Sequence, residues 1–205
     1  MCYRTKLNTK IAEIERTFEA SFTEPELFSP REEINAFDFA PNPVIADFSQ
    51  EEILFFNWGL IPSWAKENQI RKNTLNARIE TVEEKPAFRD SVKKRCLVLA
   101  SGFYEWQWLD PAGRKKQKFL IEPQGQQVFA FAGLYAPWKD PLTGALLNTY
   151  TILTTEANEL MSSIHNTKKR MPVILARQDC AGWLAGKSLE NFAYPYEVPL
   201  TATSI

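Results

Sequence analysis

A cysteine stands at position 2, directly after the initiator methionine. If Met1 is removed, Cys2 carries a free α-amine and a thiol on one residue, which no internal cysteine offers. The amine can form a Schiff base with an aldehyde, and the thiol can close on the imine to give a thiazolidine. An α-amine has an ordinary pKa of about 7.7–8.0 and a thiol of about 8.5, so both keep a nucleophilic fraction near neutrality. By itself, a cysteine after Met1 is more often a residue without a role.

Two titratable residues could move protons during such a reaction. Glu105 lies between two aromatic residues, and loss of solvent there would raise its pKa to a range that suits a general acid. The alternation of residues 103–108 favours the alternative that Glu105 lies on the solvent face of a half-buried strand. His165 is the only histidine, and its imidazole suits proton transfer near neutrality. A histidine that merely interacts with a helix end is an equally good interpretation.

Basic side chains beside this histidine are candidate anion contacts. Lys168, Lys169 and Arg170 follow His165 closely, and two further basic runs cover residues 93–95 and 114–118. Such runs are usually solvated faces, but the first one adjoins the imidazole and is the best candidate phosphate site.

Asn76, Arg78 and Trp64 are further candidate ligand contacts. Asn76 and Arg78 would share one face of an extended backbone and could hold a phosphate or a sugar, although an ordinary loop is the favoured alternative. Trp64 follows a proline in a predicted loop. An exposed indole could stack on a nucleobase, but a core tryptophan is more common.

Composition places limits on the class of protein. The chain has 205 residues, 44% of them hydrophobic and 24% charged, which is typical of one soluble globular domain over residues 1–205. The formal net charge of −1 means that an anionic ligand must meet a local basic patch. Three widely spaced cysteines argue against a disulfide framework, and no ligand spacing indicates a metal site. We expect no cofactor, no membrane span, a monomer, and a cytoplasmic location.

Hydrophobic periodicity predicts the elements that must position these residues. An amphipathic helix is expected over residues 9–22, followed by a long surface loop over 23–43. A β-meander is expected in the middle of the chain, and strands dominate overall, so the fold class is α+β with a mainly antiparallel sheet. The predicted strands cover residues 53–60, 96–99, 103–108, 118–121, 128–134, 150–153 and 173–176, and two later helices cover 156–164 and 179–185.

Five blocks in the chain resemble the SOS-response-associated peptidase (SRAP) family. The blocks are Met1-Cys2-x-Arg4, Trp58-Gly59-Leu60-x-Pro62-x-Trp64, Asn76-Ala77-Arg78-x-Glu80-Thr81, Gly102-Phe103-Tyr104-Glu105-Trp106, and His165 ahead of Arg170-Met171-Pro172. The resemblance implies a sensor of abasic sites in single-stranded DNA that loses Met1 and joins Cys2 to the open sugar aldehyde as a thiazolidine crosslink. It also implies a compact single domain around a curved, barrel-like antiparallel sheet with a few flanking helices, associated with the nucleoid when bound to DNA.

The resemblance also implies roles for single residues. Cys2 would supply both nucleophiles, Glu105 would assist sugar ring opening and proton transfer, and His165 would be a second acid or base. Asn76 would orient the Cys2 amine or the sugar, and Arg78 would hold phosphate. Further DNA contacts are implied at Arg4, Pro41, Trp64, Thr154 and Arg170.

Two departures from the family pattern are visible. Tyr3 stands where the family usually has glycine, beside the nucleophile. Four residues separate His165 from Arg170, whereas the family usually has one. The longer loop adds two positive charges, Lys168 and Lys169, next to the predicted site.

Two other functions fit parts of the sequence. A cysteine peptidase could use Cys2, His165 and Glu105 as nucleophile, base and orienting group, with cleavage after its own Met1 as the evident reaction. An associated lyase activity at abasic sites would follow from a Schiff base that does not close. A non-covalent binder of single-stranded DNA would use the basic runs and Trp64, but the net charge of −1 makes this the weakest hypothesis.

Overall fold

The computed structural model describes residues 2–205, and five of its strands close into a barrel. Neighbouring strands follow the order β11–β10–β7–β4–β5, and a parallel pairing between β5 and β11 closes the ring. The barrel strands are β4 (Pro41–Ala46), β5 (Ser49–Trp58), β7 (Arg95–Ala100), β10 (Phe129–Lys139) and β11 (Leu146–Glu156). Four short strands extend this sheet, namely β2 (Ser21–Phe22), β6 (Asn76–Arg78), β12 (Arg170–Pro172) and β13 (Ile174–Leu175).

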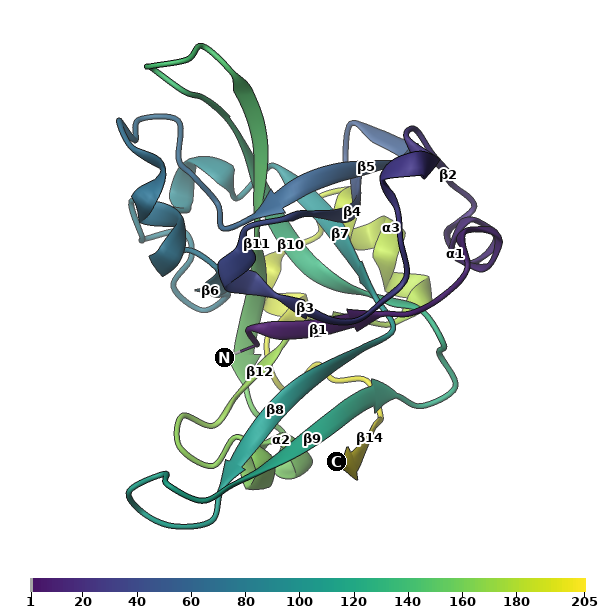
Figure 1. Ribbon diagram of the computed structural model, residues 1–205, viewed down its shortest axis with the longest axis vertical. Coiled ribbons are helices and arrows are strands. Elements are labelled where there is room, and N and C mark those ends of the chain that lie inside the picture. Colours follow the sequence, from purple (N-terminus) through teal and green to yellow (C-terminus); the bar gives the residue numbers. More distant parts are fainter. Residues whose placement is uncertain (1) are drawn as a thin grey trace.

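A second sheet of five strands packs beside the barrel (Figure 1). Its strand order is β14–β9–β8–β1–β3, and all of its pairings are antiparallel. The strands are β1 (Arg4–Leu7), β3 (Arg31–Asn35), β8 (Gly102–Trp108), β9 (Lys116–Pro123) and β14 (Leu200–Ser204). Together with the barrel and short helices, this sheet confirms the α+β class and the curved, barrel-like architecture.

Short helices flank the sheets. The α-helices are α1 (Ile11–Phe18), α2 (Glu159–Ile164) and α3 (Cys180–Leu184). Short 3₁₀ helices cover Pro25–Leu27, Ala36–Asp38, Asn68–Asn73, Arg89–Ser91, Arg177–Asp179 and Leu189–Phe192. Among residues 2–205, no helix is long and apolar enough to cross a membrane.

The core fills the barrel and the space between the two sheets. Every residue of β7 is buried, and Phe129 and Phe131 of β10 meet edge to face at 4.9 Å. Burial of such side chains stabilises the fold by about 1.5–3 kcal/mol each. A Cβ atom at Gly133 would lie 2.8 Å from the sulfur of Cys96, so the close approach of β10 and β7 requires glycine there.

The predicted extent of the first helix, the long loop and the meander are wrong. The helix ends at Phe18 because Glu19 adopts a left-handed conformation with φ of 55°, and Phe22 instead pairs in β2 beside Ile53 of β5. Residues 23–43 are no continuous loop, since β3 and the start of β4 lie within them. The middle of the chain is no meander, because the chain leaves the barrel at Ser101 to form the β8–β9 hairpin and returns to it in β10.

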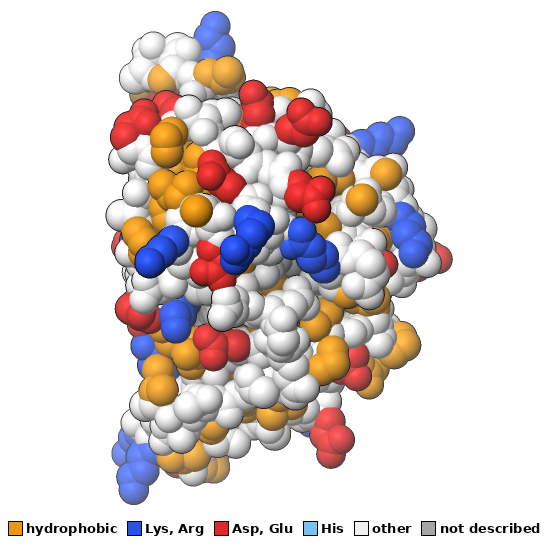
Figure 2. Space-filling model, turned by 90° about the vertical axis from the view of Figure 1, so that its right-hand side faces the viewer, with side chains coloured by type: hydrophobic (Ala, Val, Ile, Leu, Met, Phe, Trp, Pro, Cys, Tyr) orange, Lys and Arg blue, Asp and Glu red, His pale blue; other side chains and the backbone are white. Residues whose placement is uncertain are grey.

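Charged side chains of both signs are mixed on the surface. On the face shown in Figure 2, Lys and Arg side chains lie among Asp and Glu side chains. This mixture agrees with the formal net charge of −1, so any basic ligand-binding surface must be local.

Candidate active site around Cys2

Cys2 lies just before β1, which pairs with β8 and with the edge strand β3 in the second sheet. Arg4 of β1 is in register with Tyr104 of β8 on one side and Asn35 of β3 on the other. The side chain of Cys2 is fully buried, and its sulfur contacts the carbonyl oxygen of Arg4 at 3.8 Å. Burial and the negative charge of Glu105 raise the pKa of the thiol well above its ordinary value. The thiol is therefore protonated at neutral pH in this environment.

Glu105 projects from β8 toward the interior, on the face opposite Tyr104. Its side chain is 5% exposed, so the prediction that it lies on a solvent face is wrong. The alternation of residues 103–108 is present, but the second sheet packs on both faces, and Tyr104 is buried as well. Burial raises the pKa of Glu105 to about 7. The carboxyl group is thus divided between its acid and its base form near neutrality, which suits a proton donor and acceptor.

His165 ends α2, where its amide donates to the carbonyl oxygen of Met161. The imidazole is 7% exposed, and Nδ1 lies 2.8 Å from the carbonyl oxygen of Arg170. The backbone amide of Arg170 also lies 3.3 Å from Nδ1, so both backbone polar groups of Arg170 contact this nitrogen. The carbonyl contact is the shorter of the two, and because a carbonyl can only accept, it favours the tautomer with the proton on Nδ1. Burial lowers the pKa of His165, and the nearby cations Lys168 and Arg170 lower it further. The ring is neutral at pH 7 and can accept a proton.

Asn76 connects β6 to Cys2. β6 pairs in parallel with β11, so the prediction that Asn76 and Arg78 lie in an ordinary loop is wrong. The Nδ2 atom of Asn76 donates to the carbonyl oxygen of Cys2 at 2.9 Å. Its Oδ1 atom is buried and has no hydrogen-bond partner among residues 2–205. The amide therefore holds the backbone of Cys2 and keeps one acceptor available.

Arg170 returns to the site despite the longer loop before it. The amide of Lys169 donates to the carbonyl oxygen of His165, so residues 166–169 bulge outward while Arg170 stays in contact with the imidazole. The guanidinium forms a bidentate ion pair with Glu80, at 2.9 and 2.7 Å, and donates to the carbonyl oxygen of Thr154 at 2.7 Å. Thr154 itself is fully buried. Arg170 and Thr154 therefore make their hydrogen bonds within the protein and support the wall of the site.

The other predicted contacts lie on the surface. Arg78 is exposed, and its Cα is in register with Thr154. Arg4 is half-buried, forms an ion pair with Glu33, and lies over the Trp106 ring at 5.9 Å. The last two predicted DNA contacts, Pro41 and Trp64, lie on other segments of the chain. Pro41 is the exposed first residue of β4, and Trp64 is 53% exposed with its indole N–H donating to the carbonyl oxygen of Pro86.

Sequence reasoning missed two contacts in this region, the ion pair of Glu80 with Arg170 and the packing of Tyr3 on Phe37. The role of Glu80 as the partner of Arg170 was not predicted, although it stands two residues after Arg78 in the same block. Hydrogen bonds from Arg170 outweigh the effect of burial and lower the pKa of Glu80. Tyr3 packs on the exposed ring of Phe37, with ring centroids 5.2 Å apart, so an aromatic pair flanks Cys2.

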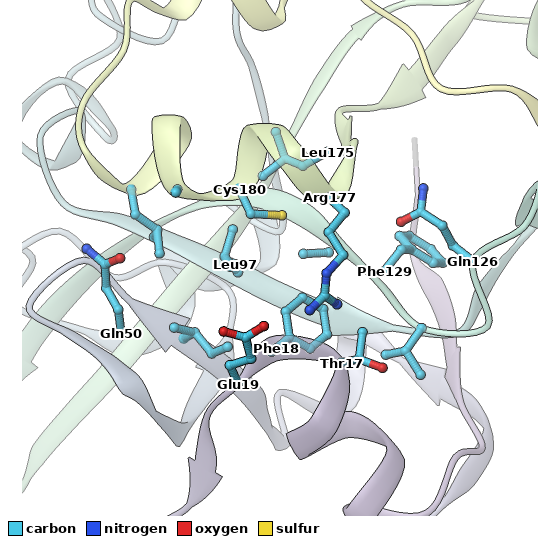
Figure 3. Close-up of a pocket in the computed structure, with 15 residues that line it drawn as sticks. Thr17, Phe18, Glu19, Gln50, Leu97, Gln126, Phe129, Leu175, Arg177 and Cys180 are labelled. Carbon is cyan, nitrogen blue, oxygen red and sulfur yellow. The ribbon is translucent and has the colours of Figure 1, made fainter.

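A separate cavity of about 240 Å³ lies between α1, α3 and the barrel. Figure 3 shows Cys180 at this cavity together with Arg177, which extends toward Phe18. None of the predicted site residues lines it. Within the described part of the chain, no group of three His, Cys, Asp or Glu side chains is placed to hold a metal ion.

This fold and this arrangement around Cys2 define a protein of the SRAP family. The family model for the SOS response associated peptidase (SRAP) matches residues 1–203, so the chain belongs to this family. A solved structure of a protein from Bacteroides thetaiotaomicron superposes with a TM-score of 0.90 at 32% identity, covering 100% of this chain and 92% of that one.

Named relatives are similar over a large part of the chain. Abasic site processing protein YoqW of Bacillus subtilis is 44% identical over 160 residues, which are 75% of this chain and 69% of YoqW. Abasic site processing protein HMCES of Gallus gallus is 37% identical over 152 residues, which are 63% of this chain and 44% of HMCES. The chain thus corresponds to less than half of the longer vertebrate protein.

Proposed function

We propose that this protein captures abasic sites in single-stranded DNA by joining Cys2 to the sugar aldehyde as a thiazolidine. The observation that carries the proposal is the placement of Cys2, held by Asn76 and electrostatically coupled to Glu105, whose pKa is about 7. The names of the relatives, abasic site processing proteins, support the choice of substrate.

Removal of Met1 is the first requirement, because it turns the Cys2 nitrogen from an amide into an amine. In the closed sugar, Glu105 assists transfer of the hydroxyl proton from C1′ to the ring oxygen, which opens the ring to the aldehyde. The amine adds to the carbonyl carbon and one amine proton passes to the carbonyl oxygen, which becomes a hydroxyl. The protonated carboxyl of Glu105 then gives its proton to the departing hydroxyl, and the nitrogen returns its remaining proton to the carboxylate. One water leaves and an imine remains.

Ring closure then removes the imine. The Cys2 sulfur adds to the imine carbon, and the thiol proton moves to the nitrogen. Neutral His165 is the second base available for this proton, since burial keeps its pKa low. The net change is formation of one C–N and one C–S bond, with loss of the aldehyde C=O bond and release of one water.

The raised pKa of the Cys2 thiol matters for the choice between hypotheses. A cysteine peptidase needs a thiolate that attacks a neutral amide, and burial disfavours the thiolate here. Thiazolidine closure needs only a thiol beside an electrophilic imine. The buried, protonated sulfur therefore favours aldehyde capture over general peptidase activity. A single self-cleavage after Met1 stays a prediction.

Arg4 and Arg78 would contact the phosphates on either side of the captured sugar, and Trp64 and Pro41 would contact neighbouring bases. In this proposal Arg170 holds His165 in place through its carbonyl oxygen, and Thr154 holds Arg170 through a hydrogen bond to the guanidinium. A Schiff base that opens before ring closure would allow strand cleavage, which accounts for a lyase side activity. The monomeric state and the cytoplasmic location stay predictions.

A denaturing gel tests the proposal. Protein that lacks Met1 is mixed with a single-stranded oligonucleotide carrying one abasic site, and in parallel with a tetrahydrofuran analogue that has no aldehyde. We expect a shifted band with the abasic strand alone, absent in Cys2→Ala. Shifted bands with both strands, or an undiminished band in Cys2→Ala, would contradict capture through Cys2.

A further inference from the structure

We infer that the loop of residues 166–169 and the turn of the β8–β9 hairpin together form a second contact surface for the phosphate backbone of single-stranded DNA. We call this surface the basic tip and define it by Arg114, Lys115, Lys116, Lys168 and Lys169. The inference rests on the proposed function and extends it to the part of the strand beyond the captured sugar.

Hydrogen bonds clamp the loop onto the hairpin. The amide of Trp108 donates to Oδ1 of Asn166 at 3.2 Å, and Nδ2 of Asn166 donates back to the carbonyl oxygen of Trp108 at 2.9 Å. Nearby, Nε2 of Gln107 donates to the carbonyl oxygen of Ser163 at 3.0 Å. Two basic runs that are about fifty residues apart in the sequence therefore meet in space, as Figure 1 shows at the end of β8 and β9.

The turn of the hairpin is also rigid. Asp110 accepts hydrogen bonds from the amides of Ala112, Arg114 and Lys115. Gly113 has φ of +64°, and a Cβ there would lie 2.6 Å from the Trp108 ring, so only glycine allows this packing. Lys116 covers the same ring at 5.1 Å. The backbone that carries these cations is fixed, which lowers the entropy lost when they bind a ligand.

Positive charge is concentrated here. Residues 106–118 and 163–170 contain seven Lys or Arg side chains and one acid, Asp110, in a chain with a formal net charge of −1. Lys118 is paired with Glu33, and Arg170 with Glu80. The five residues of the basic tip are exposed, and none has an ion-pair partner within residues 2–205. An exposed, unneutralised cluster on a rigid frame is complementary to a polyanion.

The position of the basic tip favours DNA over an acidic protein. β8 carries Glu105 in the site and Trp108 three residues later, a separation of about 10 Å along the strand. Lys168 and Lys169 lie three and four residues after His165 in the chain. If the strand keeps the stacked spacing of about 3.4 Å per nucleotide, the basic tip would meet phosphates roughly three nucleotides from the captured sugar, and a more extended strand would reach it with fewer.

Crosslinking rates of charge variants test this inference. Lys168→Ala/Lys169→Asn and Arg114→Ala/Lys115→Ala each remove two charges, and asparagine suits position 169, where φ is 46°. Lys10→Ala/Lys139→Ala is the matched control, since both lysines are exposed on other parts of the molecule. The probes are single strands with one central abasic site and either one or eight nucleotides on each side, at several NaCl concentrations.

Both tip variants should match wild type on the short strand and lose the faster rate that wild type and the control show on the long strand. The slope of log rate against log salt should become shallower by about 1.4, since each lost phosphate contact accounts for about 0.7 on single strands. Equal rates and slopes for wild type and both tip variants on the long strand would overturn the inference.

A non-covalent measurement separates this inference from the proposed function. Fluorescence anisotropy with tetrahydrofuran strands of the same two lengths needs no aldehyde and no Cys2 chemistry. Weaker binding of the tip variants to the long strand supports the basic tip even if crosslinking fails. Unchanged affinity for the long strand rejects it even if crosslinking succeeds.

Discussion

The side chain of Asn76 donates from Nδ2 to the carbonyl oxygen of Cys2 at 2.9 Å, which ties β6 of the barrel sheet to the start of β1 in the second sheet. The other end of the amide, Oδ1, is buried without a hydrogen-bond partner among residues 2–205. A buried acceptor that lacks a donor costs about 1–3 kcal/mol. The amine formed on loss of Met1, or a sugar hydroxyl, would supply that donor.

Asn76→Ala should slow crosslinking of an abasic strand by roughly 100-fold, because a nucleophile displaced by about 1 Å loses about that factor. Asn76→Asp keeps the acceptor and loses the donor to Cys2, so it should recover only part of the rate. Single-turnover rates on a denaturing gel give the comparison, and Asn148→Ala in β11 serves as a control. A wild-type rate in Asn76→Ala would rule out the orienting role.

Glu105→Gln should lower the crosslinking rate by about 10² to 10⁴, the usual contribution of a general acid or base. The pKa of Glu105 is about 7, so its proton is present below pH 7 and lost above it. The amine has the opposite dependence, with an ordinary pKa of about 7.7–8.0. Wild type should therefore show a rate maximum near neutrality, measured from pH 5 to 9.

Glu105→Gln should lose the decline in crosslinking rate above pH 7. It should keep the rise in rate that follows deprotonation of the amine. If Glu105→Gln still declines above pH 7, the proton donor is another group. Gln107→Glu, a change on the same face of β8, controls for altered charge near the site.

His165→Gln should slow ring closure more than imine formation, because in the proposed mechanism the neutral imidazole receives the thiol proton. The pKa of His165 is lowered, so wild type keeps its base at pH values below the ordinary imidazole range. Quenching time points with borohydride separates trapped imine from closed product by mass. We expect more trapped imine in His165→Gln than in wild type. Equal fractions of imine would assign His165 a structural role.

Glu80→Gln should destabilise the fold by about 1–3 kcal/mol, as expected for hydrogen bonds to a charged group, and toward the lower end because the Glu80 side chain is 37% exposed. Arg170 lowers the pKa of Glu80 in the folded protein. The contribution of Glu80 to the free energy of unfolding is therefore fully present above the ordinary pKa of about 4.5 and is lost as the pH falls below it. Urea unfolding at pH 7 and pH 3.5 measures the difference.

The gap in unfolding free energy between wild type and Glu80→Gln should shrink at pH 3.5. Glu84→Gln, an exposed acid on the following turn, is the control and should change stability by less than about 0.5 kcal/mol. A constant gap at both pH values would mean that the ion pair contributes little.

The sequence predicted the strands that carry long apolar or alternating runs. β7, β8 and β10 are examples, since their hydrophobic pattern is set locally by which face is buried. It did not predict β3, because residues 23–43 are rich in proline and show no hydrophobic period. Nor did it predict that the chain changes sheets between β7 and β8, which depends on pairings with β1 and β10 far along the chain.

For the candidate site, the sequence predicted which residues take part but not how they are buried or paired. Residue types and the family blocks named Cys2, Asn76, Glu105 and His165, and the structure brings Asn76 and Glu105 to Cys2. The burial of Glu105 could not be predicted from alternation, because alternation shows two faces without showing what covers each one. The same limit applies to Arg170, whose pairing with Glu80 joins β12 to the segment after β6.

Intact mass spectrometry of the crosslink tests the central claim most directly. Wild-type protein and an abasic strand should give one adduct whose mass is the sum of Met1-free protein and DNA minus one water. Neither borohydride nor iodoacetamide should modify the Cys2 position in that adduct, because a thiazolidine has no imine and no free thiol. Cys2→Ser should give an adduct only after borohydride treatment. An adduct on wild type that borohydride reduces, or a stable adduct on Cys2→Ser without reductant, would contradict thiazolidine capture.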